Sequence, residues 1–218
     1  MLQELCCASG RCARKRPAHG KTLRVTLQDL RPTQTSVGMR AVANKRERVE
    51  RRAQERKRLE RYLGKRPIPS VLGPGGELFM IDHHHLGLAL WQAEVETVFV
   101  SIIEDWSVLP VATFWQQMEA QGRLHPFDEE GRRIKPQRLP LRLGGLRADP
   151  YRDLAWSVRE AGGYDKVTKP YSEFEWAAYF RVRIGERAIA RDYEAAVSRA
   201  VQLAHSKDAA RLPGYRAR

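Results

Sequence analysis

The sequence has no long hydrophobic run. Among its 218 residues, no stretch reaches the roughly 18 consecutive apolar residues that a transmembrane helix needs. The first 20 residues also lack an apolar core of signal-peptide length. These two absences predict a soluble, cytoplasmic protein that contacts no membrane.

Cysteine is scarce and confined to the N-terminus. The three cysteines, Cys6, Cys7 and Cys12, lie within the first 20 residues. Their spacing does not match common zinc sites, and three thiols cannot all pair within one chain. We therefore expect free thiols in a disordered basic leader, residues 1–20.

The positive charge is placed unevenly. Residues 1–66 contain 19 Lys and Arg against 6 Asp and Glu, a surplus equal to the net charge of +13 of the whole chain. Residues 67–218 are therefore neutral in sum. A basic arm on a neutral body indicates contact with a polyanion, most often nucleic acid.

Hydrophobic periodicity and turn residues predict a mixture of strands and helices. Pro32 indicates a loop at 29–34, and the pattern Ser172–Glu175 is typical of a capping box. The predicted strands are 21–27, 68–72, 77–81 and 96–103, and the predicted helices are 38–63, 83–91, 110–121, 149–160, 172–184 and 188–206. Trp156, Trp176, Tyr179 and Phe180 fit the core better than a base-stacking role.

The long helix at 38–63 is rich in cations. Its candidate nucleic-acid contacts are Arg46, Arg51, Arg52, Arg56, Lys57 and Arg58. Interleaved glutamates also fit a solvated helix face, with Glu47 and Arg51 as an i, i+4 pair. Both interpretations of this surface stay open.

Asp82-His83-His84-His85 is the densest group of possible acid–base residues or ligands. The group joins a predicted strand to a predicted helix, whose first amides are unpaired and attract anions. Histidines there could hold phosphate or move protons. Asp82 could bind Mg²⁺ or accept a proton. Plain helix capping and a zinc site are the alternatives, and consecutive helical residues diverge, so at least one histidine is structural.

Ordered motifs carry a resemblance to a known family. They are Leu30-Arg31-Pro32-Thr33-Gln34, Gly73-Pro74-Gly75-Gly76, Ile81 to His85, Asp149 to Trp156, Gly162-Gly163-Tyr164 and Glu173 to Arg181. Over about residues 21–185 the chain resembles the ParB-like nuclease family of the ParB/sulfiredoxin superfamily.

The resemblance implies an α/β (α+β) fold. It consists of a small mixed sheet with flanking helices and a helical C-terminal extension. The implied parts are a ParB/sulfiredoxin-like domain at 21–122, an extension packed on it at 123–185, and a C-terminal helix and tail at 186–218.

The resemblance also implies a phosphate or nucleotide site. Archaeal serine kinases of the superfamily have Asp-Gly-His-His-Arg where this chain has Asp82 to Leu86. Asp82, His84 and His85 match the kinase residues and are the implied catalytic groups, with Asp82 also a ligand for Mg²⁺. His83 replaces the glycine and Leu86 the arginine. The absence of cysteine at this motif excludes sulfinic-acid reduction.

The implied phosphate ligands are Gln34, Gly38, His83, His84, His85 and Arg152. Gln34 could instead cap a turn, and Arg152 could form a surface ion pair. The leading hypothesis is a nuclease or nucleotide-dependent phosphate enzyme, with ATP, ADP or CTP as candidate nucleotides. The alternatives are a non-catalytic nucleic-acid-binding module and a partner-binding protein with a decayed pocket. A homodimer is compatible with each.

Overall fold

A computed structural model describes residues 22–217, so the predicted leader and its cysteines lie outside the described residues. Five strands form one mixed sheet in the order β1-β6-β4-β5-β2. β1–β6 and β4–β5 are antiparallel, whereas β4–β6 and β2–β5 are parallel. The strands are β1 (Thr22–Thr26), β2 (Leu30–Pro32), β4 (Ile68–Leu72), β5 (Leu78–Met80) and β6 (Thr97–Asp105). This arrangement confirms the predicted fold class.

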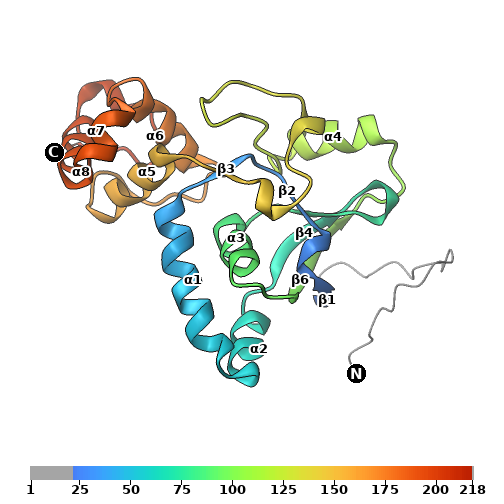
Figure 1. The fold of residues 1–218 in the computed structure, drawn as a ribbon. Coiled ribbons are helices and arrows are strands. Elements are labelled where there is room, and N and C mark those ends of the chain that lie inside the picture. Colours follow the sequence, from blue (N-terminus) through green and yellow to red (C-terminus); the bar gives the residue numbers. More distant parts are fainter. Residues whose placement is uncertain (1–21, 218) are drawn as a thin grey trace, which may run out of the picture.

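Helices surround this sheet and continue into a C-terminal group (Figure 1). The helices are α1 (Met39–Ala53), α2 (Arg56–Gly64), α3 (His84–Gln92), α4 (Val111–Ala120), α5 (Pro150–Glu160), α6 (Ser172–Arg181), α7 (Glu186–Arg191) and α8 (Tyr193–Ala204). A short ladder between β3 (Ser36–Val37) and β7 (Arg147–Ala148) ties the segment before α1 to the segment before α5. In the described part of the chain, no helix is long and apolar enough to cross a membrane.

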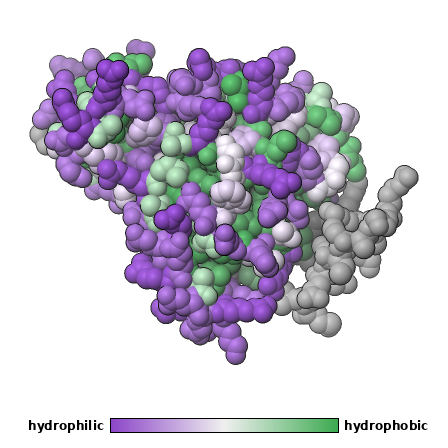
Figure 2. Space-filling model, viewed as in Figure 1, coloured by the Kyte–Doolittle hydropathy of each residue, from purple (hydrophilic) through white to green (hydrophobic). Residues whose placement is uncertain are grey.

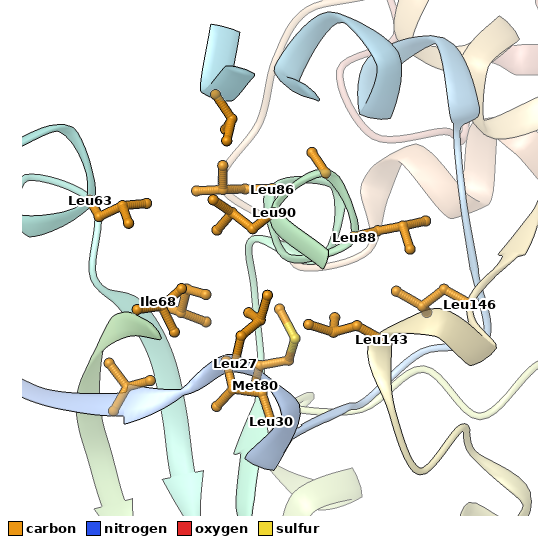
Figure 3. Packing of buried hydrophobic residues seen from close by; sticks show 14 of the residues in the cluster. Leu27, Leu30, Leu63, Ile68, Met80, Leu86, Leu88, Leu90, Leu143 and Leu146 are labelled. Carbon is orange, nitrogen blue, oxygen red and sulfur yellow. The ribbon is translucent and has the colours of Figure 1, made fainter. Parts of the chain in front are cut away.

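α3 occupies the centre of the main hydrophobic core. Its leucines Leu86, Leu88 and Leu90 are all buried, because the helix lies between the sheet and α1 (Figures 1 and 3). A helix that is apolar on most sides is expected only in such a position. The start of α3, which carries the histidines, is therefore fixed by packing on both sides.

The helices α5 to α8 enclose a second core. Trp176 and Phe180 are fully buried there, and Tyr164 stacks on Trp176 with ring centroids 4.3 Å apart. This confirms that Trp176, Tyr179 and Phe180 belong to the core. The Trp176 Nε1–H also donates to the Pro213 carbonyl at 2.8 Å, so the C-terminal segment packs on this core.

Several boundaries differ from the sequence prediction. The helix predicted at 38–63 is two helices, because Glu55 is extended at φ −129° and α2 starts anew. The helix predicted at 188–206 is likewise interrupted at Asp192, which caps α8 by accepting from the Ala195 N–H. The loop predicted at 29–34 contains β2, an edge strand, where Pro32 is tolerated.

The predicted capping box at the start of α6 is wrong. Tyr171, in the left-handed region at φ 60°, occupies the N-cap position, and Ser172 is already helical. Glu175, the acidic residue of the predicted box, pairs instead with Lys169 at 2.6 Å. The Glu175 N–H, which a Ser172 cap would have satisfied, donates to the Tyr171 carbonyl instead.

Candidate functional site

The chain turns sharply where β5 leads into α3. The Asp82 Oδ1 accepts a hydrogen bond from the His83 N–H at 2.6 Å. His83 itself has φ 66° and ψ 23°, a left-handed conformation that costs a non-glycine residue about 1–2 kcal/mol. The glycine that the kinase motif carries at this place fits such a backbone. A histidine held there indicates a constraint other than stability.

The three histidines point in different directions, as helical geometry requires. His84 is buried, and its Nε2 accepts a hydrogen bond from the Thr33 N–H at 3.1 Å. The Nε2 of His85 accepts one from the Gly38 N–H at 3.2 Å. Both rings therefore attach the start of α3 to the β2–α1 segment.

The acceptor role of these two rings requires the neutral form. Burial lowers the pKa of His84 to about 3, and the electrostatic effects of His85 and of the Arg152 cation act in the same direction. Burial likewise lowers the pKa of His85 to about 3, with Arg152 and Lys45 contributing. At neutral pH neither Nε2 is available as a proton donor.

His83 lines a cavity, as His85 does, but its ring makes no hydrogen bond to the β2–α1 segment. Its Nδ1 has no hydrogen-bond partner among the described residues. Burial lowers the pKa of His83, Asp82 opposes this shift, and Lys45 and Arg66 reinforce it. His83 is thus a neutral imidazole whose Nδ1 is buried and has no partner among the described residues.

The cavity lies between the motif and the helices α1 and α2. Its volume is about 580 Å³, and its lining residues are Lys45, Arg48, Arg51, Arg52, Arg58, Tyr62, Arg66, Asp82, His83, His85 and Leu86. Six of these side chains are cationic, and Asp82 is the single carboxylate. Figure 2 shows hydrophilic side chains over α1 and α2 at the lower left of this face. This cavity brings together two features that are separate in the sequence, the basic helix and the histidine motif.

The cationic side chains of the cavity are close enough to shift one another's pKa values. Burial lowers the pKa of Lys45, and Arg48 and Arg66 lower it further, whereas Asp82 raises it. Helix geometry also leaves the amides of His84, His85 and Leu86 without acceptors inside α3. Like charges crowded beside free amides favour the binding of an anion.

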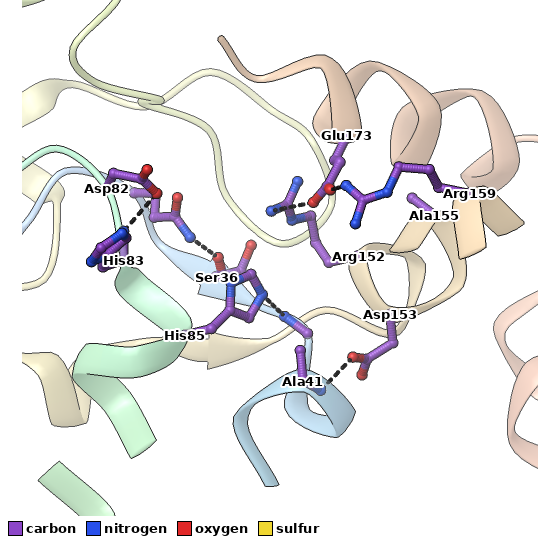
Figure 4. Close-up of polar contacts among 12 residues, drawn as sticks. Ser36, Ala41, Asp82, His83, His85, Arg152, Asp153, Ala155, Arg159 and Glu173 are labelled. Atoms are coloured by element: carbon purple, nitrogen blue, oxygen red, sulfur yellow. Dashed lines mark hydrogen bonds and ion pairs between the residues drawn. The ribbon is translucent and has the colours of Figure 1, made fainter. Parts of the chain in front are cut away.

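Two predicted ligands, Gln34 and Gly38, are not among the residues that line the cavity, and both make internal contacts. The Gln34 Nε2 donates to the Ser36 carbonyl at 2.7 Å, which fits a turn-capping role. The amides that follow Gly38 at the start of α1 bind the carboxylate of Asp153, at 3.0 Å from the Arg40 nitrogen (Figure 4). The N-terminus of α1 therefore already holds an internal anion.

Arg152 lies on the opposite side of His85 from His83 (Figure 4). It is 6% exposed, so a surface ion pair is wrong for this residue. Its Nη2 lies 3.6 Å from Glu173, and its guanidinium carbon lies 3.6 Å from the Phe174 ring centroid. Its Nε and Nη1 have no partner among the described residues.

Asp149 caps α5, as predicted, because its carboxylate accepts a hydrogen bond from the Tyr151 N–H.

The structure divides the predicted nucleic-acid contacts into two groups. Arg51, Arg52 and Arg58 line the cavity. Arg46 pairs with Glu50 at 3.3 Å on the outer face of α1. Arg56 and Lys57, exposed in the first turn of α2, are not among the lining residues.

The sequence reasoning missed Lys45, Arg48, Tyr62 and Arg66. A signal for two of them was present, because Lys45, Arg48 and Arg52 follow the i, i+3, i+7 spacing of one helix face. Val42 and Val49 mark the buried face of the same helix. Arg66 carries no such signal, since it follows the end of α2.

Few side chains that could bind a metal ion lie near Asp82. Residues 22–217 contain no group of three or more His, Cys, Asp and Glu side chains arranged to hold a metal ion. Mg²⁺ commonly binds one or two carboxylates together with ligand phosphates and water. Asp82 fits that mode, in which the phosphates would supply most of the oxygens.

The comparisons with known proteins agree with this fold. A family model described as "Putative ParB-like nuclease" matches residues 23–182. The crystal structure of protein Atu1540 from Agrobacterium tumefaciens superposes with a TM-score of 0.82 at 37% sequence identity. The match covers 91% of this chain and 99% of that one. No curated protein matches the chain.

Proposed function

This chain belongs to the ParB-like nuclease family, and we propose that it binds the phosphate groups of a nucleotide or nucleic acid in the basic cavity. The reaction proposed there is phosphoester cleavage or phosphoryl transfer. The observation that carries the proposal is the cavity lining, which places six cations and one carboxylate around the strained His83.

Electrostatics supports a ligand with several negative charges. Asp82 offsets only one of the lining cations, and the neutral histidines add no charge at neutral pH. Cations held in a concave, partly desolvated site bind phosphate more strongly than isolated surface charges do. A volume of about 580 Å³ is within the usual range for small-molecule ligands.

Two groups in the cavity can accept a proton. The Asp82 carboxylate lies at its edge, and the lowered pKa of His83 leaves this imidazole neutral at pH 7. Either could take the proton of an attacking water or hydroxyl, while the arginines stabilise charge that develops on the phosphate. Because His84 and His85 are engaged in structural hydrogen bonds, we assign the chemistry to Asp82 and His83.

Mg²⁺ would supply charge neutralisation if it entered with the phosphates. The carboxylate of Asp82 would then be its protein ligand. In that arrangement Asp82 orients the ion, and proton transfer falls to His83.

Isothermal titration calorimetry with ATP, ADP and CTP, with and without Mg²⁺, tests the proposal. Arg66→Gln removes a lining cation, and Arg56→Gln is its control outside the cavity. We expect Arg66→Gln to weaken binding by about tenfold, the effect of one charge-assisted hydrogen bond. We expect Arg56→Gln to bind like the wild type. Equal effects of the two variants, or no binding of any nucleotide, would contradict the proposal.

A second candidate function is nucleic-acid binding without catalysis. It is favoured by Arg56 and Lys57, which are exposed near the cavity-lining Arg58. A phosphate backbone that enters the cavity could continue along α2. Filter binding of single-stranded and duplex DNA over a range of salt concentrations tests this function. Affinity that barely changes with salt is incompatible with it.

A further inference from the structure

Tyr62 of α2 contacts two arginines that come from different elements. The guanidinium carbon of Arg52, on α1, lies over its ring at 4.5 Å from the centroid. That of Arg66, which follows α2, lies at 4.3 Å from the same centroid. All three side chains line the cavity. The two guanidinium carbons are therefore within about 9 Å of each other. The Tyr62 ring is within cation–π range of both.

Each of these arginines has a second contact that fixes its direction. The Arg52 Nη1 donates to the Arg48 carbonyl at 2.6 Å. The Arg66 Nη1 donates to the Tyr62 carbonyl at 3.4 Å. Within residues 22–217, neither guanidinium forms an ion pair with a carboxylate. Each keeps further N–H groups that a ligand could use.

We propose that Tyr62 is a positioning residue that holds Arg52 and Arg66 as a clamp for two linked phosphates. This inference rests on the proposed function and specifies the ligand class. The site would prefer pyrophosphate, or consecutive phosphates of a longer ligand, to a single orthophosphate.

The physical reason is pre-organisation. Two neighbouring guanidinium groups repel each other, and free arginine side chains lose conformational entropy when a ligand fixes them. An aromatic ring attracts both groups and orders them before the ligand arrives. A single phosphate engages one guanidinium well, whereas two linked phosphates engage both and gain from the ordering of each.

Calorimetric titration with orthophosphate, pyrophosphate and tripolyphosphate tests the clamp. Tyr62→Phe keeps the ring, and Tyr62→Leu removes it. We expect the wild type and Tyr62→Phe to bind pyrophosphate at least about tenfold more tightly than orthophosphate. We expect Tyr62→Leu to bind pyrophosphate about tenfold more weakly than the wild type, with orthophosphate affinity changed less than about twofold.

A second set of variants covers the case in which Tyr62→Leu does not fold. Arg52→Gln/Arg66→Gln with Tyr62 intact should lose the same preference for pyrophosphate.

The outcomes separate the two proposals. If Tyr62→Leu or the double variant keeps the preference for pyrophosphate, the clamp is overturned while phosphate binding in the cavity stands. If the wild type binds the phosphates with no preference, the clamp is again overturned. If the wild type binds none of them, the proposed function fails together with the clamp.

Discussion

The Asp82 carboxylate accepts a hydrogen bond from the backbone N–H of His83, at 2.6 Å, at the point where the chain adopts a left-handed conformation. This contact places both side chains at the cavity, while the Nε2 atoms of His84 and His85 are engaged by the backbone of Thr33 and Gly38. A single backbone turn therefore separates the groups available for chemistry from the groups that hold the fold.

The left-handed backbone of His83 predicts an unusual order of stability. His83→Gly relieves the strain, whereas His83→Ala keeps the strain and also loses the ring. We expect the glycine variant to be more stable than the alanine variant by about 1 kcal/mol. Urea unfolding of the two variants measures this difference. An alanine variant at least as stable as the glycine variant would show that no strain is present.

Asp82 should affect binding and turnover in opposite directions. Asp82→Asn keeps an oxygen that can accept from the His83 N–H but removes the single negative charge of the cavity lining. We expect affinity for nucleotide in the absence of Mg²⁺ to rise about fivefold. We expect turnover of any substrate found to fall about 100-fold or more. Unchanged turnover in this variant would remove Asp82 from the chemistry.

The buried histidines predict acid sensitivity. The unfolded chain protonates each imidazole near pH 6.5, whereas the folded chain keeps His84 and His85 neutral down to about pH 3. The contribution of each to the free energy of unfolding is therefore complete above pH 6.5. It is lost as the pH falls from 6.5 to 3, by about 1.4 kcal/mol per pH unit.

Denaturant unfolding between pH 4 and 6.5, compared in wild type and His84→Gln/His85→Gln, checks this loss. The double variant should have a distinctly shallower pH dependence of stability, because the unfolded state no longer takes up these two protons. An identical slope in both proteins would mean that the two rings titrate normally in the folded chain.

Gly38 should tolerate no side chain. A Cβ at this position would lie 2.3 Å from the Asp153 Oδ1, which binds the first amides of α1. We expect Gly38→Ala to lower the free energy of unfolding by about 2 kcal/mol. Gly64→Ala is the matched control, because its Cβ would meet only Phe99, at 4.0 Å. Thermal unfolding in which both variants are equally stable would contradict the close contact.

Local sequence rules predicted those helices and strands in which one sequence pattern runs through the whole element. The β-branched residues of β6 and the apolar run of α3 were sufficient for these two elements. The rules failed where tertiary contacts decide. β2 exists because its edge position accepts Pro32, and the break before α2 has no proline or glycine to announce it.

The candidate site was predictable in part for the same reason. The Asp82–His85 motif and the basic helix are each visible as local patterns. Their meeting in one cavity depends on how α1 and α2 pack beside α3, which no local pattern encodes. The roles of the three histidines also depend on partners that are distant in sequence, Thr33 and Gly38.

The most direct test of phosphate binding beside His83 is the imidazole ¹⁵N spectrum of the protein during a titration with pyrophosphate. We expect the His83 resonances to shift as the ligand saturates the site, because an anion raises the pKa of a neighbouring imidazole. The resonances of His205, which lies at the end of α8, should stay in place. Saturable binding that leaves the His83 resonances unmoved would contradict the account.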